Sequence, residues 1–306
     1  MQGIFIRIAY DHGSNVPGAI AARSLAVAPL LTLFISPARR ARALLAAPQL
    51  AAMAALSVSN TITYFVSIER MSPALVTLFV YIYPALAVIG SRLLGWTPIT
   101  GLAVVATAST IGGIVLTIGV PEGTIDPLAT VFSLVNGSFY ACWLLLAQAA
   151  LRTVDALTCF AASNGLAQLV VLIGSYVVAA PEFSSDATGI FALVATGTLS
   201  TVLAFLLQLH GIARVGGAAT ALITSLEIVT VIAAAAAILG DPIGPGVVGG
   251  GLLVFIGAIL APLSITRAGS AEAPGLARDV AADRRRPLGY RGPRWRGRTR
   301  ARRDRA

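Results

Sequence analysis

Charged residues are scarce in this sequence of 306 residues, and lysine is absent altogether. Charged residues make up 11% of the chain, less than half of the roughly 25% found in soluble domains. Hydrophobic residues make up 57%. Without lysine there is neither a P-loop lysine for ATP nor a Schiff-base lysine for pyridoxal phosphate. The composition excludes a soluble globular domain and predicts an all-α polytopic membrane protein.

Cysteine and histidine are also rare, with two residues each. Cys142 and Cys159 lie in apolar stretches without a His or Cys at metal-ligand spacing, so neither a disulfide framework nor a metal site is predicted. His12 and His210 lack a nucleophile or metal-ligand partner, and neither G-x-S-x-G nor H-E-x-x-H occurs. We therefore expect no catalytic residue, no metal and no cofactor, and no enzyme activity.

One glycine-rich segment, residues 244–249, reads literally as G-x-G-x-x-G. No strand is expected before it and no acidic residue follows about 20 positions later, so a dinucleotide site is not predicted. Gly246 and Gly250 instead form G-x-x-x-G in an apolar stretch, a spacing that lets two membrane helices approach closely. We expect this segment to pack against another helix.

Long apolar stretches fill the chain as far as residue 265. A helix of about 20 apolar residues crosses the roughly 30 Å hydrocarbon core of a bilayer. Breaks that contain proline or acidic residues, such as Ser72-Pro73 and Asp241-Pro242, separate the stretches. The sequence predicts nine complete spans, at residues 17–35, 48–67, 73–94, 98–119, 127–150, 156–180, 187–209, 217–239 and 243–265.

The loops between these spans sort by charge. One set carries arginine with a single acid, and these residues are Arg39, Arg40, Arg42, Arg92, Arg152, Asp155 and Arg214. The other set carries acids with a single arginine, and these residues are Asp11, Glu69, Arg70, Glu122, Asp126, Glu182, Asp186 and Asp241. The positive-inside rule makes the first set cytoplasmic. We expect a multi-pass protein of the cell (inner or plasma) membrane with a cytoplasmic C-terminus.

Both ends of the chain are unusual. Residues 1–10 are apolar, but as a helix they would extend only about 15 Å. They are either the remnant of a first span whose start is missing or a short interfacial helix. Residues 267–306 contain thirteen arginines and four acids and are predicted to form a disordered cytoplasmic tail. This tail either contacts anionic lipid headgroups or is inert, and no specific nucleic acid partner is expected.

The chain also contains an internal repeat. Residues 68–119 align with residues 212–265, pairing Arg70 with Arg214 and Tyr83 with Glu227. With the N-terminal stub counted, each half has five helices, and an odd number makes the two copies antiparallel in the membrane. Such inverted repeats recur in transporters, with the substrate site near the midplane between the halves.

Residues 62–95 and 209–261 carry a family resemblance. They read ITYFVSIERMSPALVTLFVYIYPALAVIGSRLLG and LHGIARVGGAATALITSLEIVTVIAAAAAILGDPIGPGVVGGGLLVFIGAILA, and Ala22-Arg23-Ser24-Leu25 adds an arginine-bearing second helix. This pattern resembles the EamA family of the drug/metabolite transporter superfamily. The departures are a mostly missing first helix, Trp96 in place of an acid and Ile228 in place of a proline. The resemblance implies a ten-helix architecture of two inverted five-helix repeats, with the first helix truncated here.

These observations predict three regions and one leading function. The regions are a first repeat at 1–119, a second at 127–265 and the arginine-rich tail at 267–306. The leading function is secondary transport of small organic solutes, metabolites or drugs, by alternating access. A membrane-embedded lipid-modifying enzyme and a non-transporting scaffold or sensor remain alternatives. The expected partners are a small-molecule substrate and the lipid bilayer, with a homodimer left open.

Polar residues within the spans are the candidate site, because ionisable and polar groups inside a membrane are costly. Many pair at i, i+4 spacing and so share a helix face, as Asn60 does with Tyr64. The candidates for the transport pathway are Arg23, Asn60, Tyr64, Tyr83, Asn136, Tyr140, Gln208, Thr224 and Glu227. Each Asn, Gln or Tyr could instead hold two helices together, and Arg23 could snorkel to the interface. Glu227 is expected to be desolvated, with Arg23 as its pairing partner, and either exchanges a proton or is structural.

Overall fold

The structure, a computed structural model, describes residues 2–30, 36–119, 124–178, 180–230, 233 and 244–283. Every regular element in this described part of the chain is helical. The chain divides into two compact units, Met1–Ala268 and Gly269–Ala306. The helices are α1 (Gln2–Asp11), α2 (Val16–Val27), α3 (Pro37–Leu45), α4 (Ala47–Ile68), α5 (Pro73–Val80), α6 (Tyr83–Leu93), α7 (Gly101–Ile118), α8 (Pro127–Ala150), α9 (Ala156–Val178), α10 (Ala187–Gly197), the π-helical segment η2 (Thr198–Leu203), α11 (Ala204–Thr224) and α13 (Pro245–Asp283).

The breaks that the sequence suggested act as helix starts. Ser72 and Asp126 precede a proline, and each accepts a hydrogen bond on its side chain from a backbone N–H of the first turn. The Asp126 carboxylate accepts from Ala129 N at 2.8 Å. Proline is tolerated at the first helical position because its missing N–H would be unpaired there anyway. Capping groups of this kind satisfy the free amides at a helix start and so fix where each helix begins.

The protein is a multi-pass membrane protein. Six helices in the described residues are long and apolar enough to cross a bilayer, or seven if the bent pair α3–α4 is one span. Large apolar side chains point outward from them, such as Val177 (83% exposed) and Leu207 (64% exposed). So much exposed apolar surface marks a surface that faces lipid.

The nine predicted spans match this arrangement only in part. Four of them, at 17–35, 156–180, 217–239 and 243–265, include residues outside the described ranges. Residues 187–224 form one helical run across two predicted spans, and the expected boundary appears as a kink at Gly216, whose φ is +82°. The predicted span 73–94 is divided between α5 and α6 at Tyr81 and Ile82.

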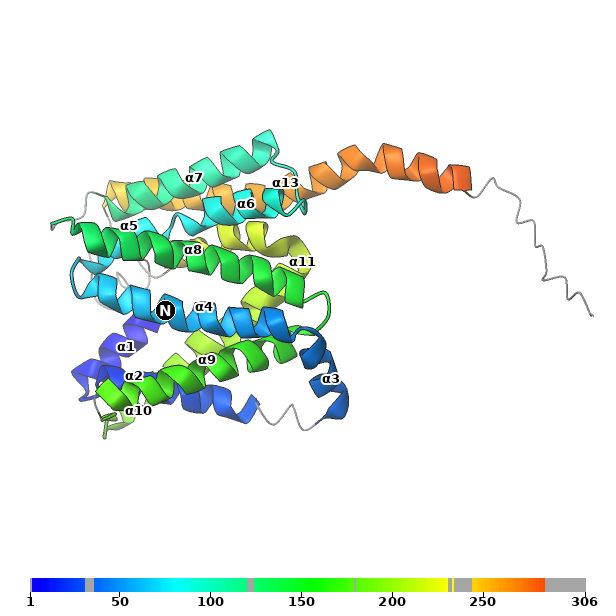
Figure 1. Ribbon diagram of the computed structural model, residues 1–306. Coiled ribbons are helices and arrows are strands. Elements are labelled where there is room, and N and C mark those ends of the chain that lie inside the picture. The colour runs from blue at the N-terminus through cyan, green and yellow to red at the C-terminus, as the bar shows by residue number, and fades with distance from the viewer. Residues whose placement is uncertain are drawn as a thin grey trace, which may run out of the picture. The chain divides into compact units, whose positions relative to one another are not determined.

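The core of the bundle forms where α4, α8 and α9 meet (Figure 1). Met53 of α4, Leu144 of α8 and Phe160 of α9 are fully buried in one apolar cluster. Because lipid tails are as apolar as these side chains, the cluster stabilises the bundle by close packing rather than by exclusion of water. This packing fixes α4, α8 and α9 against one another.

Helices α7 and α13 contact each other through small residues. A Cβ atom added to Gly113 would lie 2.6 Å from the carbonyl oxygen of Gly250 and 2.7 Å from the backbone nitrogen of Val254. A Cβ added to Gly246 would lie 3.0 Å from the carbonyl oxygen of Leu116. The predicted packing of the Gly246–Gly250 segment against another helix is therefore confirmed.

The two ends of the chain are helical within the described residues. Helix α1 packs against α10, with Phe5 and Phe191 in an edge-to-face contact at 6.4 Å between ring centroids. The sequence predicts disorder from Arg267 onward, whereas α13 continues to Asp283. Residues 267–283 contain six alanines, which favour a helix, but also Pro274 and Gly275, which disfavour one. Residues 284–306 lie outside the described part of the chain.

Candidate functional site

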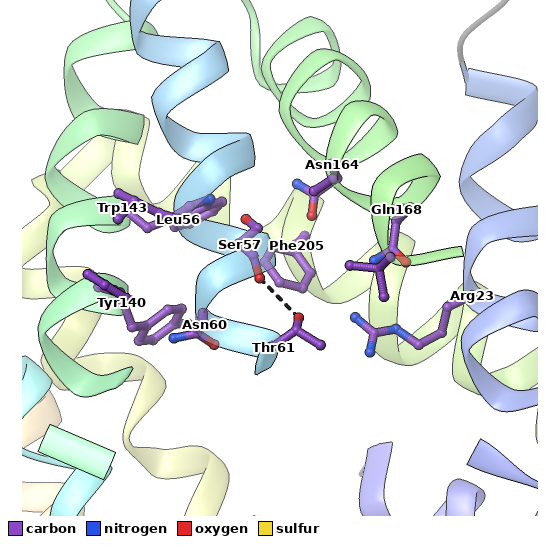
Figure 2. A pocket seen from close by; sticks show the side chains of 13 residues that line it. Arg23, Leu56, Ser57, Asn60, Thr61, Tyr140, Trp143, Asn164, Gln168 and Phe205 are labelled. Carbon is purple, nitrogen blue, oxygen red and sulfur yellow. Dashed lines mark hydrogen bonds between the residues drawn. The ribbon is translucent and has the colours of Figure 1, made fainter. Parts of the chain in front are cut away.

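A cavity of about 90 Å³ lies among five helices of unit Met1–Ala268 (Figure 2). At roughly 10–15 Å³ per water, it has room for roughly six to nine water molecules. Helices α2 and α4 contribute one part of its lining and α8, α9 and α11 the other. The lining residues are Arg23, Leu56, Ser57, Asn60, Thr61, Phe139, Tyr140, Trp143, Asn164, Ala167, Gln168, Val171 and Phe205.

One wall of the cavity is a polar stripe on α4. Ser57, Asn60 and Thr61 share a helix face because they are spaced three and four residues apart. Each hydroxyl donates to a backbone carbonyl one turn earlier. The Ser57 hydroxyl donates to the Met53 carbonyl at 2.9 Å, and the Thr61 hydroxyl donates to the Ser57 carbonyl at 3.0 Å. Each hydroxyl oxygen can still accept a hydrogen bond from a molecule in the cavity.

Asn60 also ties α4 to α8. Its Nδ2 donates to the carbonyl oxygen of Asn136 at 3.0 Å, and Asn136 Nδ2 donates in return to the carbonyl oxygen of Asn60 at 2.6 Å. Asn136 also donates to Thr63 Oγ1 at 2.9 Å and is buried. Among the predicted site residues, Asn136 therefore holds two helices together, while Asn60 both holds them and lines the cavity.

Another part of the lining is aromatic. Tyr140 and Trp143 stack with 6.2 Å between ring centroids, and Phe205 meets Trp143 edge-on at 5.6 Å. Gln208 Nε2 donates to the hydroxyl oxygen of Tyr140 at 2.6 Å and so orients that ring. The indole Nε1 of Trp143 is buried and has no hydrogen-bond partner among the described atoms. A buried donor without a partner is uncommon in folded proteins.

Arg23 brings a positive charge to the cavity from α2. Its side chain is partly buried, and its Nε atom is buried without a hydrogen-bond partner in the described part of the chain. Figure 2 shows the guanidinium pointing from α2 into the cavity, towards Thr61 and Gln168. The neighbouring Ser24 contacts the carbonyl oxygen and Oε1 of Gln168, both at 3.3 Å. Arg23 thus faces the interior of the bundle, and the alternative of snorkelling outward does not describe it.

A second polar group surrounds Tyr83, beside the cavity. The Tyr83 hydroxyl lies 3.4 Å from both Thr224 Oγ1 and Ser225 Oγ. Its ring packs edge-on against Tyr140 at 4.8 Å. Glu227 follows the turn at Ser225 and is exposed. Because Tyr83 contacts Tyr140, which lines the cavity, this group borders the cavity without lining it.

The expected pairing of Arg23 with Glu227 is not found in the described residues. Arg23 belongs to the cavity, whereas Glu227 is not among the lining residues. Among the described residues, His12 instead lies beside Asp186, with Nδ1 2.8 Å from Oδ2. Glu227 is also exposed rather than enclosed by the protein. The sequence showed that both residues sit inside apolar stretches, but not that they lie on different surfaces.

The structure brings together most of the predicted site residues. Arg23, Asn60 and Tyr140 line the cavity; Tyr83 and Gln208 contact Tyr140, Asn136 contacts Asn60, and Thr224 contacts Tyr83. Tyr64 is 37% exposed and does not line the cavity. Sequence reasoning missed Ser57, Thr61, Trp143, Asn164, Gln168 and Phe205. The i, i+4 spacing of Asn164 and Gln168 in an apolar span was a signal that could have found two of them.

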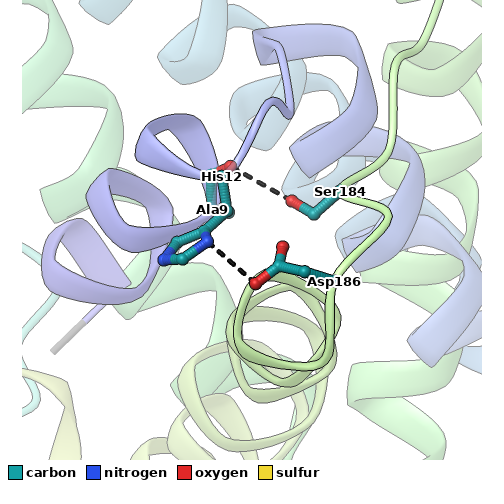
Figure 3. Close-up of polar contacts among 4 residues, drawn as sticks. All are labelled: Ala9, His12, Ser184 and Asp186. Carbon is teal, nitrogen blue, oxygen red and sulfur yellow. Dashed lines mark hydrogen bonds and ion pairs between the residues drawn. The ribbon is translucent and has the colours of Figure 1, made fainter.

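Polar contacts also cluster at the two ends of the bundle. At one end, His12 Nδ1 lies 2.8 Å from Asp186 Oδ2, and Ser184 Oγ donates to the carbonyl oxygen of Ala9 at 3.1 Å (Figure 3). At another site, the Arg152 guanidinium lies over the Trp96 ring at 4.9 Å. These contacts join loops that are distant in sequence.

Asp155 begins α9 and carries a shifted pKa. Partial burial raises the pKa of its carboxyl, but hydrogen bonds from Thr158 and the charge of Arg39 outweigh burial, so the pKa lies below its ordinary value. Thr158 donates its backbone N–H to Oδ1 at 3.0 Å and its hydroxyl to Oδ2 at 2.7 Å. This carboxylate caps α9 and faces an arginine from α3.

Comparison with known proteins gives a family match and a structural match. The sequence model described as the EamA-like transporter family matches residues 128–262. A solved structure described only as "Crystal structure of protein" superposes with a TM-score of 0.69 at 16% sequence identity, covering 86% of this chain and 93% of that one. At this identity the likeness shows the fold alone. No curated protein matches the chain.

Proposed function

Because residues 128–262 belong to the EamA-like transporter family, part of the drug/metabolite transporter superfamily, we propose that this protein is a secondary transporter of small organic solutes. The observation that carries the proposal is the cavity, whose lining comes from α2 and α4 of the first half and α8, α9 and α11 of the second. A site between two halves becomes accessible from alternate sides when the halves rock against each other.

The pattern of helix contacts supports two inverted five-helix repeats, residues 1–119 and 127–265. In such a pair, α1, α2 and α4 correspond in order to α8, α9 and α10. If each helix is replaced by its counterpart in the other repeat, the contact between α4 and α8 becomes a contact between α10 and α1. In the same way, the contact between α4 and α9 becomes a contact between α10 and α2. Both members of each pair occur, and α2 contacts its own counterpart α9. A pseudo-two-fold relation accounts for this pairing of contacts.

The loop contacts support the proposed orientation, with the arginine-rich loops and the C-terminus in the cytoplasm of a cell (inner or plasma) membrane. Arg152 contacts Trp96, and Arg39 acts on Asp155, so loops assigned to the basic side meet one another. His12 pairs with Asp186, and the Asn15 side chain accepts from the Glu182 backbone, so loops assigned to the other side meet as well. Under this orientation, the arginine-rich tail lies on the side of the anionic lipid headgroups. The attraction of these headgroups contributes about 1 kcal/mol of binding free energy per arginine near the surface.

The proposed transport draws its energy from a gradient or from exchange. The sequence contains no lysine, so this chain supplies no P-loop lysine for ATP. Rocking of the two halves around the cavity then couples the downhill movement of one solute or ion to the movement of another, or lets one solute equilibrate. A homodimer is compatible with this scheme.

Flux into proteoliposomes containing the purified protein tests the proposal. The protein is expected to accelerate uptake of at least one small organic solute in a metabolite panel. Ala167→Trp fills the cavity, because Ala167 lines it, and should reduce that uptake about tenfold or more, since an obstructed site cannot be entered. The matched control Val177→Trp places the same ring on the outer face of the same helix and should leave uptake unchanged. Equal uptake by wild type and Ala167→Trp would exclude the cavity as the pathway.

A further inference from the structure

The two buried side-chain atoms of the cavity lining that lack a partner are both hydrogen-bond donors. They are Arg23 Nε and Trp143 Nε1, and neither has a hydrogen-bond partner in the described residues. A buried donor without an acceptor costs roughly 1–3 kcal/mol, and more when it is charged. The lining therefore favours a molecule that supplies hydrogen-bond acceptors over one that supplies hydrogen-bond donors.

The charge balance of the cavity leads to the same conclusion. Arg23 is the one ionised residue of the lining, which contains neither aspartate nor glutamate. The Arg23 side chain is partly buried, and an uncompensated charge in such a place is costly until an opposite charge joins it. A guanidinium also presents parallel N–H groups that match the two oxygens of a carboxylate.

The remaining wall sets the character of the rest of the molecule. Tyr140 and Trp143 offer flat apolar surfaces on the side of the cavity away from Arg23, and Phe205 lies between them and Arg23 (Figure 2). A volume of about 90 Å³ accommodates a compact molecule rather than an extended one. An apolar body against these rings would leave its charged group next to the guanidinium.

We propose that the cavity binds a small organic carboxylate, with Arg23 holding the carboxylate and the aromatic wall holding an apolar body about the size of a phenyl ring. The inference rests on the proposed transport function and specifies its substrate class. Amines are disfavoured, because no acidic residue of the lining would neutralise an ammonium group. Zwitterions are disfavoured relative to simple carboxylates for the same reason.

Equilibrium binding of radiolabelled benzoate to the purified full-length protein near neutral pH tests this proposal. Benzamide and benzylammonium serve as neutral and cationic competitors of nearly the same shape. Wild type should bind benzoate saturably and prefer it to both competitors. Arg23→Gln should weaken benzoate binding about tenfold or more, which is the effect expected for loss of a hydrogen bond to a charged group. Arg23→Lys keeps the charge and should retain most of the preference for benzoate.

Two controls separate recognition from folding. Arg92→Gln removes an exposed arginine outside the cavity and should leave the benzoate affinity unchanged. In Arg23→Gln the affinity for benzamide should change less than about twofold, because a neutral ligand loses only a neutral hydrogen bond. A variant that had merely lost its structure would lose benzoate and benzamide binding together, so the ratio of the two affinities reports on Arg23 itself.

Several outcomes would overturn the carboxylate proposal. These are absence of saturable benzoate binding by wild type, equal benzoate affinity in Arg23→Gln, and equal or stronger competition by benzylammonium. Inorganic phosphate that displaces benzoate as well as unlabelled benzoate does would indicate a site for inorganic anions instead. Uptake of non-carboxylate solutes without benzoate binding would overturn this inference while leaving the transport function intact. Benzoate binding that depends on Arg23, without uptake of any solute, would support the carboxylate site and overturn the transport function.

Discussion

Individual polar residues in this protein divide into those that hold helices together and those that face the cavity. Asn136 belongs to the first kind, since its side-chain amide donates hydrogen bonds to the Asn60 backbone carbonyl and to Thr63 Oγ1. Arg23 belongs to the second, since its Nε atom is left without a partner. The sequence identified both as candidates because they interrupt apolar stretches. It could not separate them, because the difference depends on which residues of a distant helix lie opposite.

Asn136→Ala should destabilise the protein without altering the chemistry of the cavity. The change removes both hydrogen bonds that the Asn136 amide donates to α4. Hydrogen bonds between membrane helices contribute about 0.6 kcal/mol on average and up to about 2 kcal/mol. Thermal unfolding in detergent measures the loss. Ser138→Ala removes a hydroxyl that bonds within α8 and is the matched control, which should unfold close to wild type. A midpoint for Asn136→Ala as high as that of Ser138→Ala would show that the contact between α4 and α8 does not depend on this amide.

Asp155 should make stability depend on acid pH. Because the pKa of this carboxyl lies below its unfolded value, its contribution is present above the unfolded pKa and is lost as the pH falls through the folded pKa. Asp155→Ala should lower stability by about 0.5–2 kcal/mol near neutral pH through loss of the cap. The difference from wild type should shrink in acid. Asp155→Asn keeps an oxygen that can cap α9 but removes the titrating carboxyl. Its stability near neutral pH should lie between those of wild type and Asp155→Ala, and this residue should no longer make stability depend on acid pH. A constant difference between wild type and Asp155→Ala across the acid range would contradict this assignment.

At the scale of whole helices, small residues decide which helices approach closely. Helix α13 approaches α7 where glycines meet, and this is the feature that the G-x-x-x-G spacing predicted. The break between α5 and α6 was not located by the hydrophobic pattern, because residues 73–94 read as one apolar span, whereas the kink at Gly216 falls at the boundary expected between two spans. Apolarity reports that a segment lies in the membrane, but not where its backbone departs from a straight helix.

Neighbouring glycines of α7 provide a direct test of this packing. A Cβ at Gly113 would meet the backbone of α13 at 2.6–2.7 Å, whereas a Cβ at Gly112 would meet nothing within 4 Å. Gly113→Ala should therefore destabilise the protein by about 1–3 kcal/mol through overpacking. Gly112→Ala should be neutral or stabilising by up to about 1 kcal/mol, because alanine favours the helix. Thermal unfolding of the two variants side by side measures the difference. Equal midpoints would mean that α7 and α13 are not in close contact.

At the scale of the whole molecule, the chain is a multi-pass helical bundle with a polar and aromatic cavity lined by α2, α4, α8, α9 and α11. Composition alone predicted the membrane class, and the resemblance of residues 209–261 predicted the family that matches at 128–262. Three of the nine predicted site residues line the cavity, and most of the others contact those three directly or through a neighbour. The i, i+4 spacing of Asn164 and Gln168 placed both on one helix face and could have identified them, but it could not show which helices lie opposite that face.

Accessibility of the cavity from both sides of the membrane tests the central claim most directly, and it needs no knowledge of the substrate. Ser57→Cys would place a thiol in the cavity lining of a protein in which Cys142 and Cys159 have been replaced. A membrane-impermeant thiol reagent should label this cysteine from either side of oriented vesicles, because alternating access opens the cavity to each side in turn. Leu207→Cys, on the outer face of α11, should remain unlabelled from both sides. Labelling of Ser57→Cys from one side only, under every condition tried, would contradict the account.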